Sequence, residues 1–194
     1  EYKIRRAHEL QEGDFVMVKY GMNCWGNDTI DYDDRSIPKI KRPLGKIDAI
    51  TEDWAYFFGL YLAEGNFCDR PGRQNVTITC GDDISPLLKR LGLAAYRRDS
   101  FHYQIPNVGL VNLLKHVGLD PKLHAKEKVI PPRLMKKKKK CAAAMIRGMF
   151  DGDGSAPAGR KRILYASTSP RLIEQLRILL LNFGILSTLT DRYT

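Results

Sequence analysis

The stretch Met145-Ile146-Arg147-Gly148-Met149-Phe150-Asp151-Gly152-Asp153-Gly154-Ser155 decides the fold, because a second stretch of the chain is built in the same way. That second stretch is Ala55-Tyr56-Phe57-Phe58-Gly59-Leu60-Tyr61-Leu62-Ala63-Glu64-Gly65-Asn66. Each is a short apolar run with a glycine near its start, and each ends in an acid that is followed by a glycine. The two acids are Glu64 and Asp153. A repeat at this distance indicates one structural unit that the chain uses twice.

The composition is that of a basic globular protein. The chain has 194 residues, of which 43% are hydrophobic and 28% charged, and this length allows one large domain or two small ones. Lysine and arginine number 32 against 22 acids, and the net charge of +10 favours nucleic acid as the partner, ahead of an anionic membrane. There is no apolar run long enough to span a bilayer and no signal-peptide pattern, so we expect a cytoplasmic protein, or one that lies with the cellular DNA, and not a secreted one.

The cysteines and histidines form no metal-binding or disulfide pattern. Because no CxxC spacing occurs, we expect buried free thiols in a reducing compartment at Cys24, Cys68, Cys80 and Cys141. The histidines are His8, His102, His116 and His124, and without an HExxH pattern they predict no zinc site.

The first unit surrounds the Glu64 stretch. Thr51 is a candidate N-cap for a helix that Gly65 ends. Residues 74–80 alternate and predict a strand, whose polar face carries Arg73, Asn75, Thr77 and Thr79. Residues 84–91 predict a helix, residues 94–105 a hairpin, and residues 108–117 a further helix that ends at Gly118. The expected order is helix, two strands, helix, two strands, helix.

The second unit repeats the start of this order. The five lysines at 136–140 lead into the helix that ends at Asp153, and we expect them to form its exposed N-terminal end. Cationic side chains there oppose the helix dipole, which favours a phosphate partner. A strand at 160–168, a helix from the N-cap Ser169 to Phe183 and a strand at 186–194 are expected to follow. Because the later strands and the last helix have no counterpart, we expect the second half to be incomplete.

Most of the residues before the first unit have only weak periodicity. Residues 1–20 predict short strands around the turn Glu12-Gly13-Asp14, with an apolar strand at 15–18, and residues 21–50 predict a linker or extended arm. The expected domains are an N-terminal piece with its linker (1–45), a first half (46–140) and a second half (141–194).

Small residues predict that the two repeated helices pack together. Gly59 and Ala63 are four residues apart, as are Gly148 and Gly152, so on a helix each pair forms one stripe without large side chains. Such stripes let two helices approach backbone to backbone. A pseudo-two-fold axis between the helices would follow.

This packing would bring the acids together. Glu64 and Asp153 are each expected at the C-terminal end of a helix, where a carboxylate faces the negative end of the dipole. Two close carboxylates are unfavourable unless a cation lies between them, and a hard divalent ion resolves both problems. Metal-assisted hydrolysis of a phosphodiester is the chemistry that such a site favours. Asp151 aligns with Leu62 of the first copy and is therefore not expected to be an obligatory ligand.

At these residues the chain resembles the LAGLIDADG (dodecapeptide, or DOD-type) homing endonucleases, in their two-motif, single-chain, intein-borne form. The motif copies are Phe57-Phe58-Gly59-Leu60-Tyr61-Leu62-Ala63-Glu64-Gly65 and Ile146-Arg147-Gly148-Met149-Phe150-Asp151-Gly152-Asp153-Gly154. The resemblance covers roughly residues 50–194. It implies an α+β fold of two αββαββα halves related by a pseudo-two-fold axis, whose antiparallel sheets form a saddle over double-stranded DNA.

The resemblance also implies a mechanism. A monomer acting as a pseudo-dimer would cut both DNA strands with Mg²⁺, for which Mn²⁺ could substitute. The implied metal site is Glu64 and Asp153 with the following residues Gly65 and Gly154. Strand side chains would read the major groove. The implied DNA-binding residues are Arg73, Asn75, Thr77, Thr79, Arg98, His102, Gln104, Arg162 and Arg192.

A basic residue near the active site is a further implication of the resemblance. Intein-borne members carry it before a proline upstream of the second motif, and Lys128-Val129-Ile130-Pro131 matches this pattern. Lys128 would polarise the scissile phosphate or help to activate water. The second half offers no equivalent lysine within the sequence.

The residues from His8 to Val18 are similar to part of an intein splicing (Hint) domain. Splicing needs a Cys or Ser at the first position and a terminal His-Asn, whereas this chain has Glu1 and Thr194. We therefore interpret it as an internal part of a larger intein, or as an intein from which parts are absent. The leading hypothesis is a site-specific DNA endonuclease, which Glu64 and Asp153 favour. The alternatives are a non-cleaving DNA- or RNA-binding protein of the same fold, such as a maturase or degenerate intein insert, and a basic structural protein, which would not explain the repeat.

Overall fold

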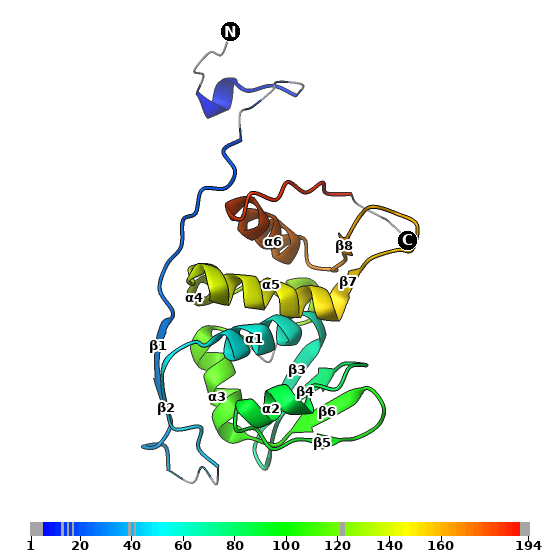
Figure 1. Ribbon diagram of the computed structural model, residues 1–194. Coiled ribbons are helices and arrows are strands. Elements are labelled where there is room, and N and C mark those ends of the chain that lie inside the picture. The colour runs from blue at the N-terminus through cyan, green and yellow to red at the C-terminus, as the bar shows by residue number, and fades with distance from the viewer. Residues whose placement is uncertain are drawn as a thin grey trace.

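The computed structural model describes residues 6–12, 14, 16, 18–38, 40, 42–120 and 123–190. Arg192 and residues 15 and 17 of the expected N-terminal strand lie outside this set. The structure is α+β, with helices packed on antiparallel sheets (Figure 1).

The first unit has the expected order of helix, two strands, helix, two strands, helix. Its first helix begins where predicted, because the Thr51 side chain accepts a hydrogen bond from Trp54 N at 3.3 Å. Its last helix ends at Gly118, whose φ of 101° is the left-handed conformation that glycine adopts at helix ends. The elements are α1 (Glu52–Glu64), β3 (Gly65–Arg70), β4 (Arg73–Thr79), α2 (Ser85–Arg90), β5 (Tyr96–Arg97), β6 (His102–Ile105) and α3 (Val108–Val117).

The four strands form one antiparallel sheet in the order β3-β4-β6-β5. Thr77 of β4 pairs with Asn66 of β3 on one side and with Gln104 of β6 on the other. Val76 and Ile78 alternate with these polar residues and are fully buried at 0% exposure, on the face that α1 and α3 contact. The alternation predicted for residues 73–80 is therefore confirmed.

The second unit begins with α5 (Lys139–Asp153), which lies between α1 and α6 (Pro170–Asn182) in Figure 1. Ser169 caps α6 as predicted, since its Oγ accepts a hydrogen bond from Leu172 N at 3.2 Å. Between the units lie η2 (Ala125–Glu127) and α4 (Pro132–Met135).

The strands of the second unit are shorter than predicted. The strand expected at 160–168 is only β8 (Leu164–Tyr165), which pairs with β7 (Gly154–Ser155) over two residue pairs. Among residues 186–190, which are the described part of the strand expected at 186–194, none is in a strand. A strand needs a neighbour for its hydrogen bonds, and alternation alone does not supply one.

The segment predicted as a linker also differs from expectation. Within 21–50 the structure contains β1 (Thr29–Asp33) and β2 (Lys46–Ala49), which pair antiparallel to each other. Ile30 and Tyr32 of β1 are buried and join the core beside α3. The described residues before 21 contain only a short 3₁₀ turn, η1 (Ala7–Glu9), and no strand.

An extended strap, residues 21–26, crosses from α6 to the lysine run. The side chain of Asn182 holds Cys24 through two hydrogen bonds of 2.9 Å, and Trp25 packs on Phe183 with ring centroids 4.5 Å apart. Gly26 N donates to Lys137 O. The strap therefore joins both ends of the second unit.

The lysine run is not uniformly exposed, contrary to prediction. Lys137 is only 5% exposed, and its Nζ donates to Thr29 O at 3.0 Å, whereas Lys136, Lys138, Lys139 and Lys140 are exposed. The thiols of all four cysteines are free, as expected, but only Cys141 is buried. None of the helices in the described residues combines the length and hydropathy needed to cross a bilayer.

Candidate functional site

The contact between α1 and α5 is the most extensive between any two elements. A Cβ atom built on Gly59 would lie 2.0 Å from Met145 O, and one built on Gly148 would lie 2.2 Å from Tyr56 O. Such distances are far inside van der Waals contact, so any side chain at either glycine would push the helices apart. The two helices approach backbone to backbone here.

The same contact aligns the ends of the two helices. A Cβ on Gly152 would lie 2.5 Å from Ala63 Cβ and 3.3 Å from Glu64 Cγ. Because Gly148 faces the middle of α1 and Gly152 faces its end, both helices run in the same direction. Their last residues are Glu64 and Asp153. The structure therefore brings the two motif acids to one end of the helix pair.

The electrostatics of this acid pair disfavour two negative charges. Burial raises the pKa of Glu64, and the negative charge of Asp153 raises it further, while Lys128 opposes both effects. Burial also raises the pKa of Asp153, against the influence of Lys128 and of Tyr165. A cation placed at the carboxylates would remove this penalty.

Tyr165 is a member of the site that sequence reasoning missed. Its hydroxyl donates to Asp153 Oδ2 at 3.4 Å from strand β8. Burial raises the pKa of this phenol, so it remains a neutral donor at neutral pH. Its place next to Asp153 depends on the pairing of β7 with β8, which the sequence pattern did not indicate.

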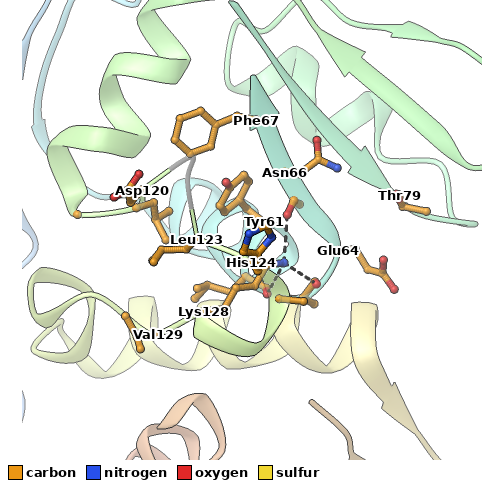
Figure 2. Close-up of a pocket in the computed structure, with 16 residues that line it drawn as sticks. Tyr61, Glu64, Asn66, Phe67, Thr79, Asp120, Leu123, His124, Lys128 and Val129 are labelled. Carbon is orange, nitrogen blue, oxygen red and sulfur yellow. Dashed lines mark hydrogen bonds between the residues drawn. The ribbon is translucent and has the colours of Figure 1, made fainter. Parts of the chain in front are cut away.

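Lys128 lies against the end of α1 (Figure 2). Its Nζ donates to Leu62 O at 3.1 Å, to Ala63 O at 3.0 Å and to Gly65 O at 3.0 Å. Burial lowers the pKa of Lys128, and the charges of Asp153 and Glu64 oppose that shift. The Lys128 carbonyl accepts a 2.6 Å hydrogen bond from Ser169 Oγ, which also caps α6. Lys128 thus connects the end of α1 with the start of α6.

A cavity of ≈ 410 Å³ opens beside this end of α1 (Figure 2). Residues of α1, of β3 and β4, and of the segments 118–120 and 123–129 line it. Its polar lining includes Glu64, Asn66, Thr79, His124 and Lys128. In Figure 2 the bonds of Lys128 converge on the main chain, while the Glu64 carboxylate extends away from them.

The polar face of the sheet carries most of the residues predicted to bind DNA. Thr77 pairs with Gln104 and Thr79 with His102, so these side chains are cross-strand neighbours on the face opposite Val76 and Ile78. Arg73 and Asn75 continue the same row on β4. Asn66, opposite Thr77 on β3, belongs to this face but was missed because residues 65–70 were not predicted as a strand.

Some of the predicted DNA-binding residues already have protein partners or lie elsewhere. His102 Nδ1 is 2.8 Å from Asp99 Oδ1, and Gln104 Oε1 accepts a hydrogen bond from the Tyr96 hydroxyl. Arg98 is exposed just after β5, and Arg162 is exposed just before β8, away from a strand ladder. Arg192 lies outside the described residues.

Glu64 and Asp153 are the side chains that would hold the expected metal ion. Among residues that the structure describes, no group of three or more His, Cys, Asp or Glu side chains gathers at metal-binding distance. The pair Glu64 and Asp153 nevertheless fits Mg²⁺, which proteins commonly hold with one or two carboxylates while waters and substrate phosphates complete the shell. Of the implied main-chain ligands, Gly65 O is engaged by Lys128, and Gly154 pairs with Tyr165 in the β7–β8 ladder.

Comparison with known proteins finds a domain in the second unit. Residues 140–194 match the model of the LAGLIDADG-like domain. This match contains α5, the β7–β8 pair and α6, and thus one of the two motif acids.

The chain is also similar to parts of several curated proteins. It is 32% identical over 146 residues to the DNA-directed RNA polymerase subunit Rpo1C of Methanocaldococcus jannaschii, covering 71% of this chain and 16% of that protein. It is 27% identical over 206 residues to Protein RecA of Mycobacterium tuberculosis, covering 98% of this chain and 24% of that protein. For the probable translation initiation factor IF-2 of Thermococcus kodakarensis, the identity is 30% over 151 residues, 73% of this chain and 13% of that protein. The chain therefore spans a quarter or less of these relatives.

Proposed function

We propose that this chain is a site-specific homing endonuclease of the LAGLIDADG type, carried within an intein, that hydrolyses both strands of a long DNA target. The observation that carries the proposal is the meeting of Glu64 and Asp153 at the shared end of two glycine-packed helices. The LAGLIDADG-like match at residues 140–194 supports it, as does the net charge of +10. A full two-half saddle, with a monomer acting as a pseudo-dimer, is part of the proposal.

The intein context is supported by the pattern of the relatives. Their names describe a polymerase subunit, a RecA protein and an initiation factor, which are three different kinds of protein. The chain nevertheless resembles a small part of each. A mobile segment inserted into different host proteins accounts for such a pattern, and an intein is a segment of this kind.

Different residues of the chain would contact the DNA and bind the metal ion. The polar face of the sheet would enter the major groove, where Asn75, Thr77 and Gln104 can donate to or accept from base edges. Glu64 and Asp153 would hold Mg²⁺, or Mn²⁺ in its place, through one carboxylate each. Bound there, the metal would polarise a phosphodiester and lower the pKa of a water molecule. Lys128 supplies positive charge beside the acids.

The test is cleavage of the uninterrupted gene. The substrate is a plasmid carrying the gene in which this sequence occurs, with the segment that encodes the insert removed and its flanks joined. We expect a linear product with Mg²⁺ and none with EDTA. Glu64→Gln and Asp153→Asn should each abolish cutting but retain binding in a gel-shift assay with Ca²⁺. Asp151→Asn is the matched control and should cut. Binding without any cutting by the unaltered protein would reject the nuclease proposal.

That last outcome would favour the second candidate, a DNA- or RNA-binding protein of the same fold that does not cut. The observation behind it is the small size of β7–β8, which pairs over only two residue pairs in the described chain. A comparison of binding to double-stranded DNA and to folded RNA of the same sequence would separate its two forms.

A further inference from the structure

The ammonium group of Lys128 has no donor left for a substrate. A protonated lysine has three N–H donors. Three carbonyl oxygens at the end of α1 lie 3.0–3.1 Å from Nζ, and each therefore takes one of them. This arrangement differs from that of a lysine that reaches a phosphate, which would need at least one donor free.

The three carbonyl groups that Lys128 contacts at the end of α1 are a favourable place for a cation. The last carbonyl groups of a helix have no partner within the helix, and together they form the negative end of its dipole. In α1 this end also carries Glu64, and Asp153 of α5 lies beside it. No basic residue lies in the last turn of α1 or of α5. The positive charge therefore has to come from another part of the chain.

Lys128 is held in this position from its other side. Ser169 Oγ donates to the Lys128 carbonyl at 2.6 Å, and the side chain of Gln175 bonds both N and O of Ile130 at 2.7 and 2.8 Å. These contacts anchor residues 128–130 to α6. The ammonium group thus reaches the end of α1 from a segment whose main chain is hydrogen-bonded to α6.

We propose that Lys128 is the resident counter-ion of the acid pair, a positioning residue that keeps the end of α1 and the carboxylates of Glu64 and Asp153 in place before a metal ion binds. The inference rests on the proposed function in one respect, because it takes the acid pair to be a divalent-metal site. It assigns Lys128 no contact with the phosphate.

Two consequences distinguish this role of Lys128 from a direct catalytic role and from a purely structural one. Without Lys128, three carbonyls of the metal-free protein lose their ammonium donor and the acid pair loses its nearby positive charge, so the protein should melt at a lower temperature. A divalent cation would then find a more negative site, and its affinity should rise on the order of tenfold. A metal ion that binds with higher affinity stabilises the folded state more. The melting temperature should therefore rise more on addition of Mg²⁺.

The experiment compares Lys128→Met and Lys128→Gln with the unaltered protein and with Lys126→Met, a control at an exposed lysine of the same segment. Methionine removes the charge and the donors, whereas glutamine removes the charge but keeps an amide donor group. Melting temperatures are measured by circular dichroism in EDTA and in Mg²⁺ at matched ionic strength. Lys128→Gln also keeps the test valid if Lys128→Met does not fold without metal.

In EDTA we expect Lys128→Met to melt on the order of 5 °C lower than the unaltered protein, with Lys128→Gln between them. Both variants should gain more from Mg²⁺ than the unaltered protein, and Lys126→Met should match it. An unchanged melting temperature together with lost cleavage would make Lys128 a direct catalytic residue and overturn the proposal. A lower melting temperature with an unchanged response to Mg²⁺, or no response in any protein, would reduce Lys128 to a structural role and also overturn it. Cleavage of the plasmid by the unaltered protein then decides the proposed function separately.

Discussion

The Tyr56 hydroxyl donates a 2.8 Å hydrogen bond to Asp151 Oδ2, across the contact between α1 and α5. Arg147 lies over the same ring, with its guanidinium carbon 4.5 Å from the centroid. Asp151 and Asp153 are two residues apart, yet the first carboxylate bonds Tyr56 on an exposed side of the helix pair and the second lies in the acid pair. Two neighbouring acids of one motif therefore have different environments.

Removing Asp151 should affect stability slightly and cleavage hardly at all. Asp151→Ala loses one exposed hydrogen bond, so we expect the free energy of unfolding to fall by less than about 1 kcal/mol in urea titrations. The rate of plasmid cleavage should stay within a few-fold of the unaltered protein. A loss of cleavage as large as that of Asp153→Asn would show that Asp151 belongs to the active site.

Adding a methyl group to the helix contact should be strongly destabilising. A Cβ at Gly148 would lie 2.2 Å from Tyr56 O, so the backbone of a helix would have to shift to admit it. We expect Gly148→Ala to lower the free energy of unfolding by about 2 kcal/mol or more. Gly81→Ala is the matched control, since its Cβ would meet only the Phe101 ring at 3.9 Å. Equal unfolding midpoints for the two variants would contradict the close approach.

The acid pair should make the metal-free protein less stable at neutral pH than at mildly acidic pH. Because the folded-state pKa values of Glu64 and Asp153 are raised above the ordinary values of 4.5 and 3.8, the folded protein binds protons more tightly than the unfolded chain. Stability from these groups is therefore lost as pH rises from the ordinary pKa values through the raised ones. In EDTA, Glu64→Gln should melt higher than the unaltered protein at pH 7.5, and the difference should shrink as the pH falls towards 4.5.

With Mg²⁺ present, the unaltered protein should melt higher than Glu64→Gln at pH 7.5. The ion requires charged carboxylates, so it should stabilise the unaltered protein at pH 7.5 and do little for Glu64→Gln. A Glu64→Gln variant that gains as much from Mg²⁺ as the unaltered protein would place the metal elsewhere.

Two positions of β4 should differ in how they affect DNA binding. Asn75, in the middle of the polar row, should contact a base edge, whereas the exposed Arg73 at the strand start should contact phosphate. Asn75→Ala should cost about 1–3 kcal/mol of binding free energy and relax the preference at one base pair. Arg73→Ala should weaken binding to all sequences and reduce the salt dependence. Binding isotherms on single-base variants of the site, at two or more salt concentrations, measure both effects.

The parts of the fold that the sequence predicts well are those set by local patterns. Thr51 and Gly65 delimit α1, and alternation places Val76 and Ile78 inside the sheet, because a cap or a two-residue period acts between near neighbours. The four-residue spacing of Gly148 and Gly152 likewise predicts the contact between the helices, because it leaves one face of the helix without large side chains.

The parts that the sequence did not predict depend on distant partners. Lys137 is buried because Thr29 offers a carbonyl group 108 residues away, and a run of lysines contains no sign of that. Tyr165 reaches Asp153 only because β8 pairs back onto β7 across the loop of residues 156–163, and the sequence did not indicate that pairing. Strand β1 does alternate, with Ile30 and Tyr32 inside, but the positive φ of 51° at Asp31 and the nearby irregularity of the ladder interrupt a regular strand.

The strap formed by residues 21–26 has a consequence for the order of folding. Cys24 and Asn182, which exchange two hydrogen bonds, are 158 residues apart in sequence. In a chain synthesised from its N-terminus, the strap emerges from the ribosome long before Lys137, which accepts from Gly26 N, and longer still before its partners in α6. Contacts between such distant residues form late and slowly. The strap is thus made before its partners and is among the last segments to dock, because it can bind only when the second motif and the helix after it are present.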